Sequence, residues 1–90
     1  MTEKYVTVKN RSGIHSRPAS VFVQIANKFS SKITMIKESG NETVNAKSIL
    51  GILTLGAVYN TKLLIRAEGA DEEQAIHALS EFFENRFDES

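Results

Sequence analysis

The segment TKLLIRAEGADEEQAIHALSEFF, residues 61–83, indicates the fold class because its hydrophobic pattern changes period halfway along. Over residues 61–68 apolar and polar residues alternate, which is typical of a half-buried strand. From Asp71 onward the apolar residues recur at helical spacing, and Asp71 with Gln74 three residues later resembles a capping box. The apolar stripe of this helix comprises Ala75, Ile76, Leu79 and Phe83. The segment therefore predicts a strand followed by an amphipathic helix.

Three shorter strands are predicted on the amino-terminal side of this segment. Residues 5–9 alternate around Val6 and Val8, and a second strand alternates around Ile33 and Met35. The residues 38–42, ESGNE, form a turn that leads into a short strand around Thr43 and Val44. The second and third strands are therefore expected to form a hairpin.

Two further helices are predicted between these strands. A helix over residues 16–29 follows from the helical spacing of Ala19, Phe22, Ala26 and Phe29, and Pro18 is tolerated because it falls in the first turn. A short helix is expected over residues 47–53, with Ser48 as a good cap residue, although Gly51 weakens its centre. The resulting order favours a mainly antiparallel sheet with its helices on one face, which is an α+β two-layer sandwich.

The composition limits both the size and the function of the protein. Ninety residues with one proline and no linker or repeat predict one domain over residues 1–90, too small to enclose a large substrate. Eleven basic and eleven acidic residues argue against nucleic-acid binding and against a polybasic membrane anchor. The absence of cysteine excludes disulfides and thiolate zinc sites. No apolar run is long enough to span a bilayer or resembles a signal peptide, so a cytoplasmic location is expected.

The heptapeptide Gly13-Ile14-His15-Ser16-Arg17-Pro18-Ala19 places an imidazole and a guanidinium where a glycine-bearing loop turns into a helix. The unpaired N–H groups of a helix start favour an anion there, and Arg17 adds a planar charged fork suited to phosphate oxygens. His15 is a nucleophile that can carry a phosphoryl group on nitrogen. Ser12 is a candidate for a nearby hydroxyl ligand. These residues predict a phosphoryl site, whereas the alternative is a polar cap residue beside a solvated arginine.

Other candidate sites carry less chemistry. His77 has no second ligand at metal spacing, so it is expected at the surface, and no metal site is predicted. The glycines form no nucleotide-cradling loop, so ATP binding is unsupported and no cofactor is predicted. Ser48 is best explained as a helix cap, although a phosphate there would meet the favourable end of the helix dipole. A helix this short cannot bury all of its aliphatic side chains, so some of Ile49, Leu50, Ile52 and Leu53 should face solvent or a partner.

Over essentially its full length the chain resembles the HPr family, the histidine-containing phosphocarriers of the bacterial phosphoenolpyruvate:sugar phosphotransferase system. The resemblance rests on the heptapeptide around His15 and on three later motifs that follow in the family's order. These are Val44-Asn45-Ala46-Lys47-Ser48-Ile49-Leu50-Gly51, then Thr54-Leu55-Gly56, and finally Gly69-Ala70-Asp71-Glu72-Glu73-Gln74-Ala75. It implies an open-faced β-sandwich with a four-stranded antiparallel sheet and three helices on one side.

The resemblance also implies roles for particular residues. His15 would accept a phosphoryl group on Nδ1 from phosphorylated enzyme I and donate it to the IIA component of a sugar permease, so the protein would be a carrier and not an enzyme. Arg17, Ser12 and Ser16 would bind the phosphate. Ser48 would be phosphorylated by an HPr kinase/phosphorylase, which favours binding to a catabolite-control transcription factor. Partner docking would use Ser20, Val21, Gln24, Lys47, Ile49, Leu50 and Leu53.

Three departures from the family's pattern accompany the resemblance. Ser16 stands where alanine or threonine is common and adds a hydroxyl, and the turn at 38–42 is about two residues longer than usual. Ile52 and Leu53 replace a methionine-rich docking helix, which predicts a narrower range of partners.

Two alternative functions stay open at this point. One is a catabolite-repression HPr homologue acting mainly through phosphorylated Ser48, against which the presence of His15 argues. The other is a small α+β interaction module without phosphoryl chemistry.

Overall fold

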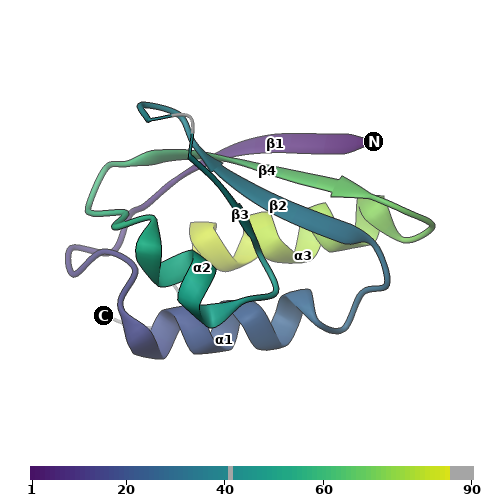
Figure 1. Cartoon of the computed structure of the whole chain (residues 1–90), viewed down its shortest axis with the longest axis horizontal. Helices are drawn as coiled ribbons and strands as arrows, with labels where there is room; N and C mark the ends of the chain where they lie inside the picture. Colours follow the sequence, from purple (N-terminus) through teal and green to yellow (C-terminus); the bar gives the residue numbers. More distant parts are fainter. Residues whose placement is uncertain (41, 86–90) are drawn as a thin grey trace.

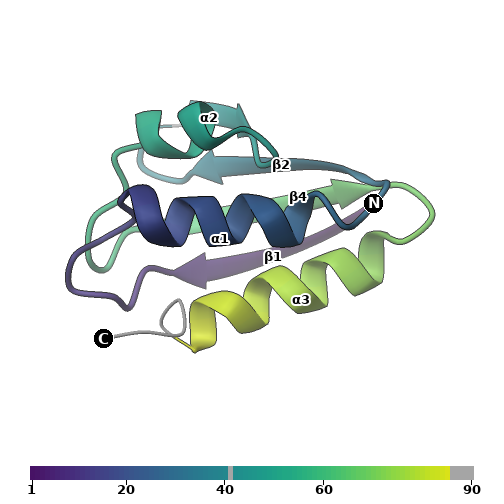
Figure 2. The same ribbon diagram turned by 90° about the horizontal axis from the view of Figure 1, so that it is seen from below.

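The computed structural model describes residues 1–40 and 42–85. Within these residues the strands are β1 (Thr2–Thr7), β2 (Lys32–Lys37), β3 (Glu42–Asn45) and β4 (Lys62–Glu68), and the helices are α1 (Ser16–Ala26), α2 (Ile49–Thr54) and α3 (Glu72–Glu84). The strands form one antiparallel sheet in the order β1-β4-β2-β3. Figure 1 shows the helices together beneath the sheet, and Figure 2 shows the same layer from the helix side. The predicted α+β open-faced β-sandwich is confirmed.

The alternation in β4 places its apolar side chains against the helices. Leu63, Ile65 and Ala67 are buried, whereas the residues between them are more exposed. Ile65 lies opposite Met35 of β2, which is also fully buried, so the two central strands supply the middle of the core. The helices close it from below with Phe22, Phe82 and Phe83, whose ring centroids lie 5.7–6.1 Å apart. Burying these large rings makes a large hydrophobic contribution to the folding stability of this small protein.

The boundaries of β1, α1 and α2 differ from the prediction. β1 runs from Thr2 to Thr7, whereas the sequence predicts residues 5–9. α1 ends at Ala26. The Phe29 N–H donates to the Ala26 carbonyl at 3.2 Å, three residues back instead of the four of an α-helix. α2 begins at Ile49 instead of Lys47, because Ser48 has an extended backbone and serves as the N-cap. The cap role of Ser48 is thereby confirmed, since its side chain accepts a hydrogen bond from the Gly51 N–H at 3.1 Å.

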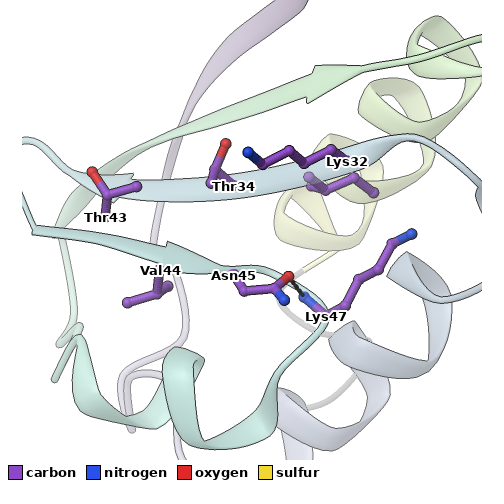
Figure 3. A pocket seen from close by; sticks show the side chains of 7 residues that line it. Lys32, Thr34, Thr43, Val44, Asn45 and Lys47 are labelled. Atoms are coloured by element: carbon purple, nitrogen blue, oxygen red, sulfur yellow. Dashed lines mark hydrogen bonds between the residues drawn. The ribbon is translucent and has the colours of Figure 1, made fainter.

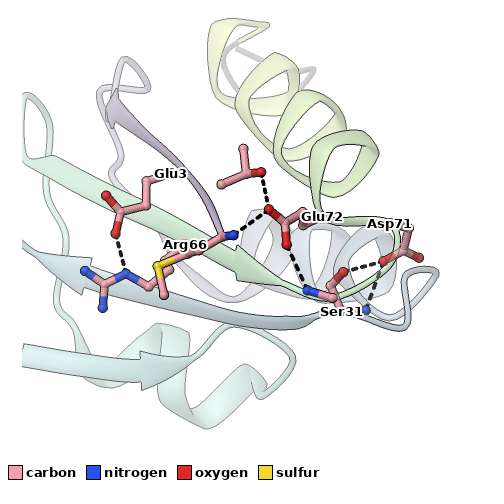
Figure 4. A network of polar contacts seen from close by, with 8 residues as sticks. Glu3, Ser31, Arg66, Asp71 and Glu72 are labelled. Carbon is pink, nitrogen blue, oxygen red and sulfur yellow. Dashed lines mark hydrogen bonds and ion pairs between the residues drawn. The ribbon is translucent and has the colours of Figure 1, made fainter.

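The predicted capping box at Asp71 and Gln74 is wrong. Asp71 is the N-cap residue of α3, but its side chain makes no capping hydrogen bond. Its carboxylate instead accepts hydrogen bonds from the Ser30 N–H at 2.9 Å, from the Ser31 N–H at 3.0 Å and from the Ser31 hydroxyl (Figure 4). Asp71 therefore joins the start of α3 to the turn before β2.

Candidate functional site

The loop that carries His15 is held by the segment between α2 and β4. After β1, the Val8 N–H donates to the Thr61 carbonyl at 2.9 Å and the Val8 carbonyl accepts from the Asn60 N–H at 2.7 Å. Directly before His15, the Ile14 N–H donates to the Ala57 carbonyl at 2.9 Å. The backbone of residues 57–61 therefore fixes the loop at both of its ends.

Gly13 is required by the way this loop turns. Its φ of +74° lies in the left-handed region, and a Cβ at this position would lie 2.8 Å from the Ala57 carbonyl oxygen. A side chain would therefore be strained by the backbone angle and by the close approach. The Gly13 N–H donates to the carbonyl of the buried Asn10, and the Asn10 side chain accepts from the Ser12 N–H. The local hydrogen bonds thus shape the turn that precedes His15.

His15 is the N-cap residue of α1, as its position before the helix predicts. Its backbone is extended, with φ −110° and ψ −169°, and its side chain makes no capping hydrogen bond. The first helical bond runs from the Ala19 N–H to the His15 carbonyl at 3.0 Å. Pro18 has no N–H to offer, so Ser16 and Arg17 supply the unpaired donors of the first turn, and neither N–H bonds to an acceptor within residues 1–40 and 42–85. These two donors directly follow His15 at the positive end of the helix dipole.

The side chains predicted to bind phosphate are exposed and make no hydrogen bonds or ion pairs with other described residues. The side chains of Ser12, His15, Ser16 and Arg17 all lie at the surface, and none makes a hydrogen bond or ion pair within the described part of the chain. The sequence between Lys4 and Lys37 contains no Asp or Glu, so no carboxylate of this stretch competes with an anion for Arg17. The arrangement can hold a phosphoryl group at the surface, where a second protein can reach it.

The predicted docking residues divide between exposed and buried positions. On α1, Val21 and Gln24 are exposed and Ser20 is half-buried. On α2, the side chains of Ile49 and Leu50 are 41% and 75% exposed and Leu53 is half-buried, whereas Ile52 is 1% exposed and belongs to the core. The prediction that this short helix cannot bury all its aliphatic side chains is confirmed.

Two exposed apolar residues next to the His15 loop are not among those that the sequence pattern predicts. Val58 and Tyr59 are 64% and 48% exposed in the loop that leads from α2 to β4. Val58 adjoins the His15 loop, since a Cβ on Gly13 would lie 3.1 Å from the Val58 Cα. The exposure of loop residues cannot be predicted from hydrophobic periodicity, because loops have none. The feature that could have indicated this exposure is the pair of apolar residues directly before the turn residue Asn60. We use the name docking surface for Val21, Ile49, Leu50, Val58 and Tyr59.

Lys47 is not a free cation beside Ser48. Its ammonium donates to the Phe29 carbonyl at 2.7 Å, and its N–H donates to the Asn45 side-chain oxygen at 2.9 Å. It also lines a hollow of about 360 Å³ at the β2–β3 edge, together with Lys32, Ile33, Thr34, Thr43, Val44 and Asn45 (Figure 3). None of these residues belongs to the loops that hold His15, so this hollow is separate from the candidate phosphoryl site.

The described residues add two observations on other kinds of site. Within residues 1–40 and 42–85 no group of three or more His, Cys, Asp and Glu side chains is arranged to hold a metal ion, and His77 is exposed on α3. Among the same residues no helix has the length and apolar character needed to cross a membrane.

Known proteins resemble this chain over nearly its whole length. Residues 2–85 match the family described as PTS HPr component phosphorylation site. The phosphocarrier protein HPr of Treponema pallidum is 42% identical over 99% of both chains, and the HPr-like protein Crh of Halalkalibacterium halodurans is 43% identical over 93% of this chain and 98% of its own. The crystal structure of HPr-C-His from Thermoanaerobacter tengcongensis has 48% identity and a TM-score of 0.94, covering 100% of this chain and 99% of that one.

These likenesses agree with the geometry around His15. The family is defined by a phosphorylation site, and the structure presents an exposed histidine at a helix start that can receive an anion. Sequence, fold and site therefore lead to one conclusion, that the chain belongs to the HPr family of phosphocarriers of the phosphotransferase system.

Proposed function

We propose that this protein accepts a phosphoryl group on His15 from phosphorylated enzyme I and donates it to the IIA components of sugar permeases. The observation that carries the proposal is the exposed His15 beside the unpaired N–H groups of Ser16 and Arg17, in a chain of the HPr family. Each transfer breaks the nitrogen–phosphorus bond of the donor and forms one at the acceptor nitrogen. The protein is thus a substrate of its partners at both steps.

The residues around His15 have distinct roles in this relay. The imidazole attacks as the neutral nucleophile, and the resemblance to the family assigns the phosphoryl group to Nδ1. The N–H groups of Ser16 and Arg17 donate hydrogen bonds to the oxygens of the phosphoryl group during transfer. The planar, charged guanidinium of Arg17 binds the same oxygens. The hydroxyls of Ser12 and Ser16 are further ligands. The exposed position suits a relay in which two different proteins must reach the same atom.

Transfer is tested by incubating the protein with phosphoenolpyruvate and enzyme I. We expect one acid-labile phosphate per chain and none on His15→Ala. His77→Ala is the matched control, since it removes the other exposed histidine from α3 and should be labelled normally. Equal labelling of His15→Ala and the unaltered protein would overturn the proposal.

The docking surface is proposed to contact enzyme I and the IIA components. Its apolar side chains come from α1, which begins directly after His15, from α2, and from the loop before β4, where Val58 adjoins Gly13. Leu50→Ser should raise the KM for enzyme I by about tenfold, the effect of losing one buried aliphatic contact. Tyr5→Ser, on an exposed residue of the open sheet face, should leave the KM unchanged. Equal KM values for the two variants would contradict this docking surface.

A second function concerns Ser48, and the likeness to the HPr-like protein Crh favours it. We propose that an HPr kinase/phosphorylase phosphorylates Ser48 and that the modified protein binds a catabolite-control transcription factor. Ser48 is half-buried and caps α2, so a phosphate on its oxygen would lie near the Gly51 N–H without unfolding the core. His15 favours transport as the main function, with Ser48 as a regulatory site.

Phosphorylation at Ser48 is tested with ATP and an HPr kinase. We expect a phosphate that survives acid, is absent from Ser48→Ala and still forms on His15→Ala. The matched control is Ser39→Ala, on an exposed serine of the hairpin. An unlabelled wild-type protein, or a labelled Ser48→Ala variant, would remove Ser48 from the proposal and leave the His15 relay standing.

A further inference from the structure

The side chain of Lys37 connects the sheet to the end of α2. Lys37 is the last residue of β2, where it lies opposite Leu63 of β4, a fully buried residue on the core side of the sheet. Its side chain is therefore directed toward the helix layer and is half-buried. The ammonium donates a hydrogen bond to the Leu55 carbonyl at 3.1 Å.

The Leu55 carbonyl is a favourable acceptor for a cation. Leu55 is the C-cap residue of α2, where the carbonyl groups of a helix run out of intrahelical partners and the dipole is negative. A hydrogen bond from an ammonium to such a carbonyl is charge-assisted and stronger than one between neutral groups. Because Lys37 is half-buried and the contact is partly shielded, water competes for this hydrogen bond less than at an exposed site.

The segment after Leu55 leads directly to His15. Gly56 turns the chain with a φ of +59°, and Ala57 is 3% exposed. The Ala57 carbonyl then accepts the hydrogen bond from the Ile14 N–H at 2.9 Å, one residue before His15. Leu55 and Ala57 are two residues apart, so a shift of the first carbonyl moves the second. Lys37 is therefore joined to the His15 backbone by two hydrogen bonds and a short tight turn.

We propose that Lys37 is a positioning residue for phosphoryl transfer at His15. By holding the Leu55 carbonyl it fixes segment 55–57, and through the Ala57 carbonyl it fixes the backbone from which the His15 imidazole and the Ser16 and Arg17 N–H groups project. The role in transfer rests on the proposed phosphocarrier function. The mechanical link can be measured without any partner protein.

The link is tested by amide hydrogen exchange in unphosphorylated protein. Lys37→Met removes the ammonium and keeps an unbranched apolar side chain of similar length. The exchange rate of the Ile14 N–H should rise about five- to tenfold. This is part of the more than tenfold effect expected from losing one charge-assisted hydrogen bond, because Ile14 feels the loss through segment 55–57. The Ala46 N–H, which donates to the Ile33 carbonyl at 3.0 Å, is the internal reference and should not change.

Lys32→Met is the matched control variant. Lys32 begins the same strand and is exposed, and it makes no hydrogen bond or ion pair within the described residues. The Ile14 exchange rate should equal that of the unaltered protein in Lys32→Met. Lys37→Arg should restore slow exchange, because a guanidinium N–H can reach the same carbonyl.

The effect on transfer separates positioning from docking. In Lys37→Met the kcat for phosphorylation by enzyme I should fall about fivefold, because the backbone that positions His15 is less rigid. The KM should stay within about twofold, because Leu50 remains exposed on α2 for docking. A lowered melting temperature with unchanged Ile14 exchange and unchanged kcat would overturn the proposal. If no variant accepts phosphate and neither does the unaltered protein, the phosphocarrier function fails, and the exchange experiment still decides whether Lys37 controls the Ile14 backbone.

Discussion

The two ends of the sheet use their polar residues in opposite ways. At the end where α3 begins, the Asp71 carboxylate accepts hydrogen bonds from Ser30 and Ser31, and the Glu72 carboxylate accepts from the Gly69 N–H at 3.1 Å, the Thr2 hydroxyl at 2.7 Å and the Met1 ammonium at 2.8 Å (Figure 4). At the other end, the side chains of His15, Ser16 and Arg17 make no such bonds within the described part of the chain.

This difference shows how a small domain separates stability from reactivity. At the α3 end, polar groups connect β1, the turn before β2 and the start of α3 by hydrogen bonds, so they stabilise the fold. The His15 end is held through backbone hydrogen bonds and through Gly13, so its side chains are left free for a ligand and a partner. Substitutions of polar side chains at the two ends should therefore separate activity from stability.

The largest effect is expected at Arg17. Arg17→Ala should lower the rate of phosphoryl transfer to His15 by roughly one hundredfold, the usual cost of removing one donor to a transition-state oxyanion. Its melting temperature should stay unchanged, because the side chain is exposed and unpartnered within the described residues. Arg11→Ala, at an exposed arginine of the same loop, is the control and should transfer normally. If the melting temperature of Arg17→Ala falls together with its transfer rate, the separation of activity from stability between the two ends is contradicted.

The next effect concerns the backbone under His15. Gly13→Ala should destabilise the protein by about 2 kcal/mol in denaturant unfolding, because both the positive φ and the contact with the Ala57 carbonyl oppose a Cβ. Gly56→Ala should cost only about 1 kcal/mol, since its φ of +59° is also positive but nothing lies within 4 Å of the added Cβ. Equal losses would show that backbone angle alone, and not the close approach, sets the requirement for glycine.

A smaller effect on the opposite end should leave transfer intact. Asp71→Asn should lower the melting temperature. Ser30 donates to one carboxylate oxygen and Ser31 to the other, and the NH2 group that replaces one of these oxygens cannot accept. Phosphoryl transfer per folded molecule should be unaltered. Glu81→Gln is the control, since this exposed acid of α3 makes no hydrogen bond or ion pair among the described residues and should not change the melting temperature.

The smallest effect is a change of stability with pH. The Met1 ammonium, followed by the Thr2 hydroxyl, lowers the pKa of Glu72 from 4.5 to about 2, and the Ser31 hydroxyl, followed by the Ser30 N–H, lowers the pKa of Asp71. A carboxylate with a lowered pKa stabilises the fold above its ordinary pKa, and this contribution is lost as the pH falls. Melting temperature should therefore decline from about pH 4.5 toward pH 2. Glu72→Gln should decline less steeply over that range, and parallel curves would contradict the role of Glu72.

The sequence was sufficient where a feature depends on local pattern. The strand at β4, the helix at α3, the cap at Ser48 and the incomplete burial of the aliphatic side chains of α2 all follow from residues a few positions apart. The partners of Asp71 are about 40 residues away in the chain, so only the fold brings the Ser30 and Ser31 donors to it. The same is true of the Lys37 ammonium and the Leu55 carbonyl.

The order of the strands has a consequence for how the chain is made. β4 pairs with both β1 and β2, yet it comes last among the described strands, at residues 62–68 of 90. A ribosome therefore releases β1, α1 and the β2–β3 hairpin before the strand that unites them exists. During synthesis the apolar faces of these elements have no sheet to cover them, so the nascent chain is most prone to aggregation just before β4 emerges.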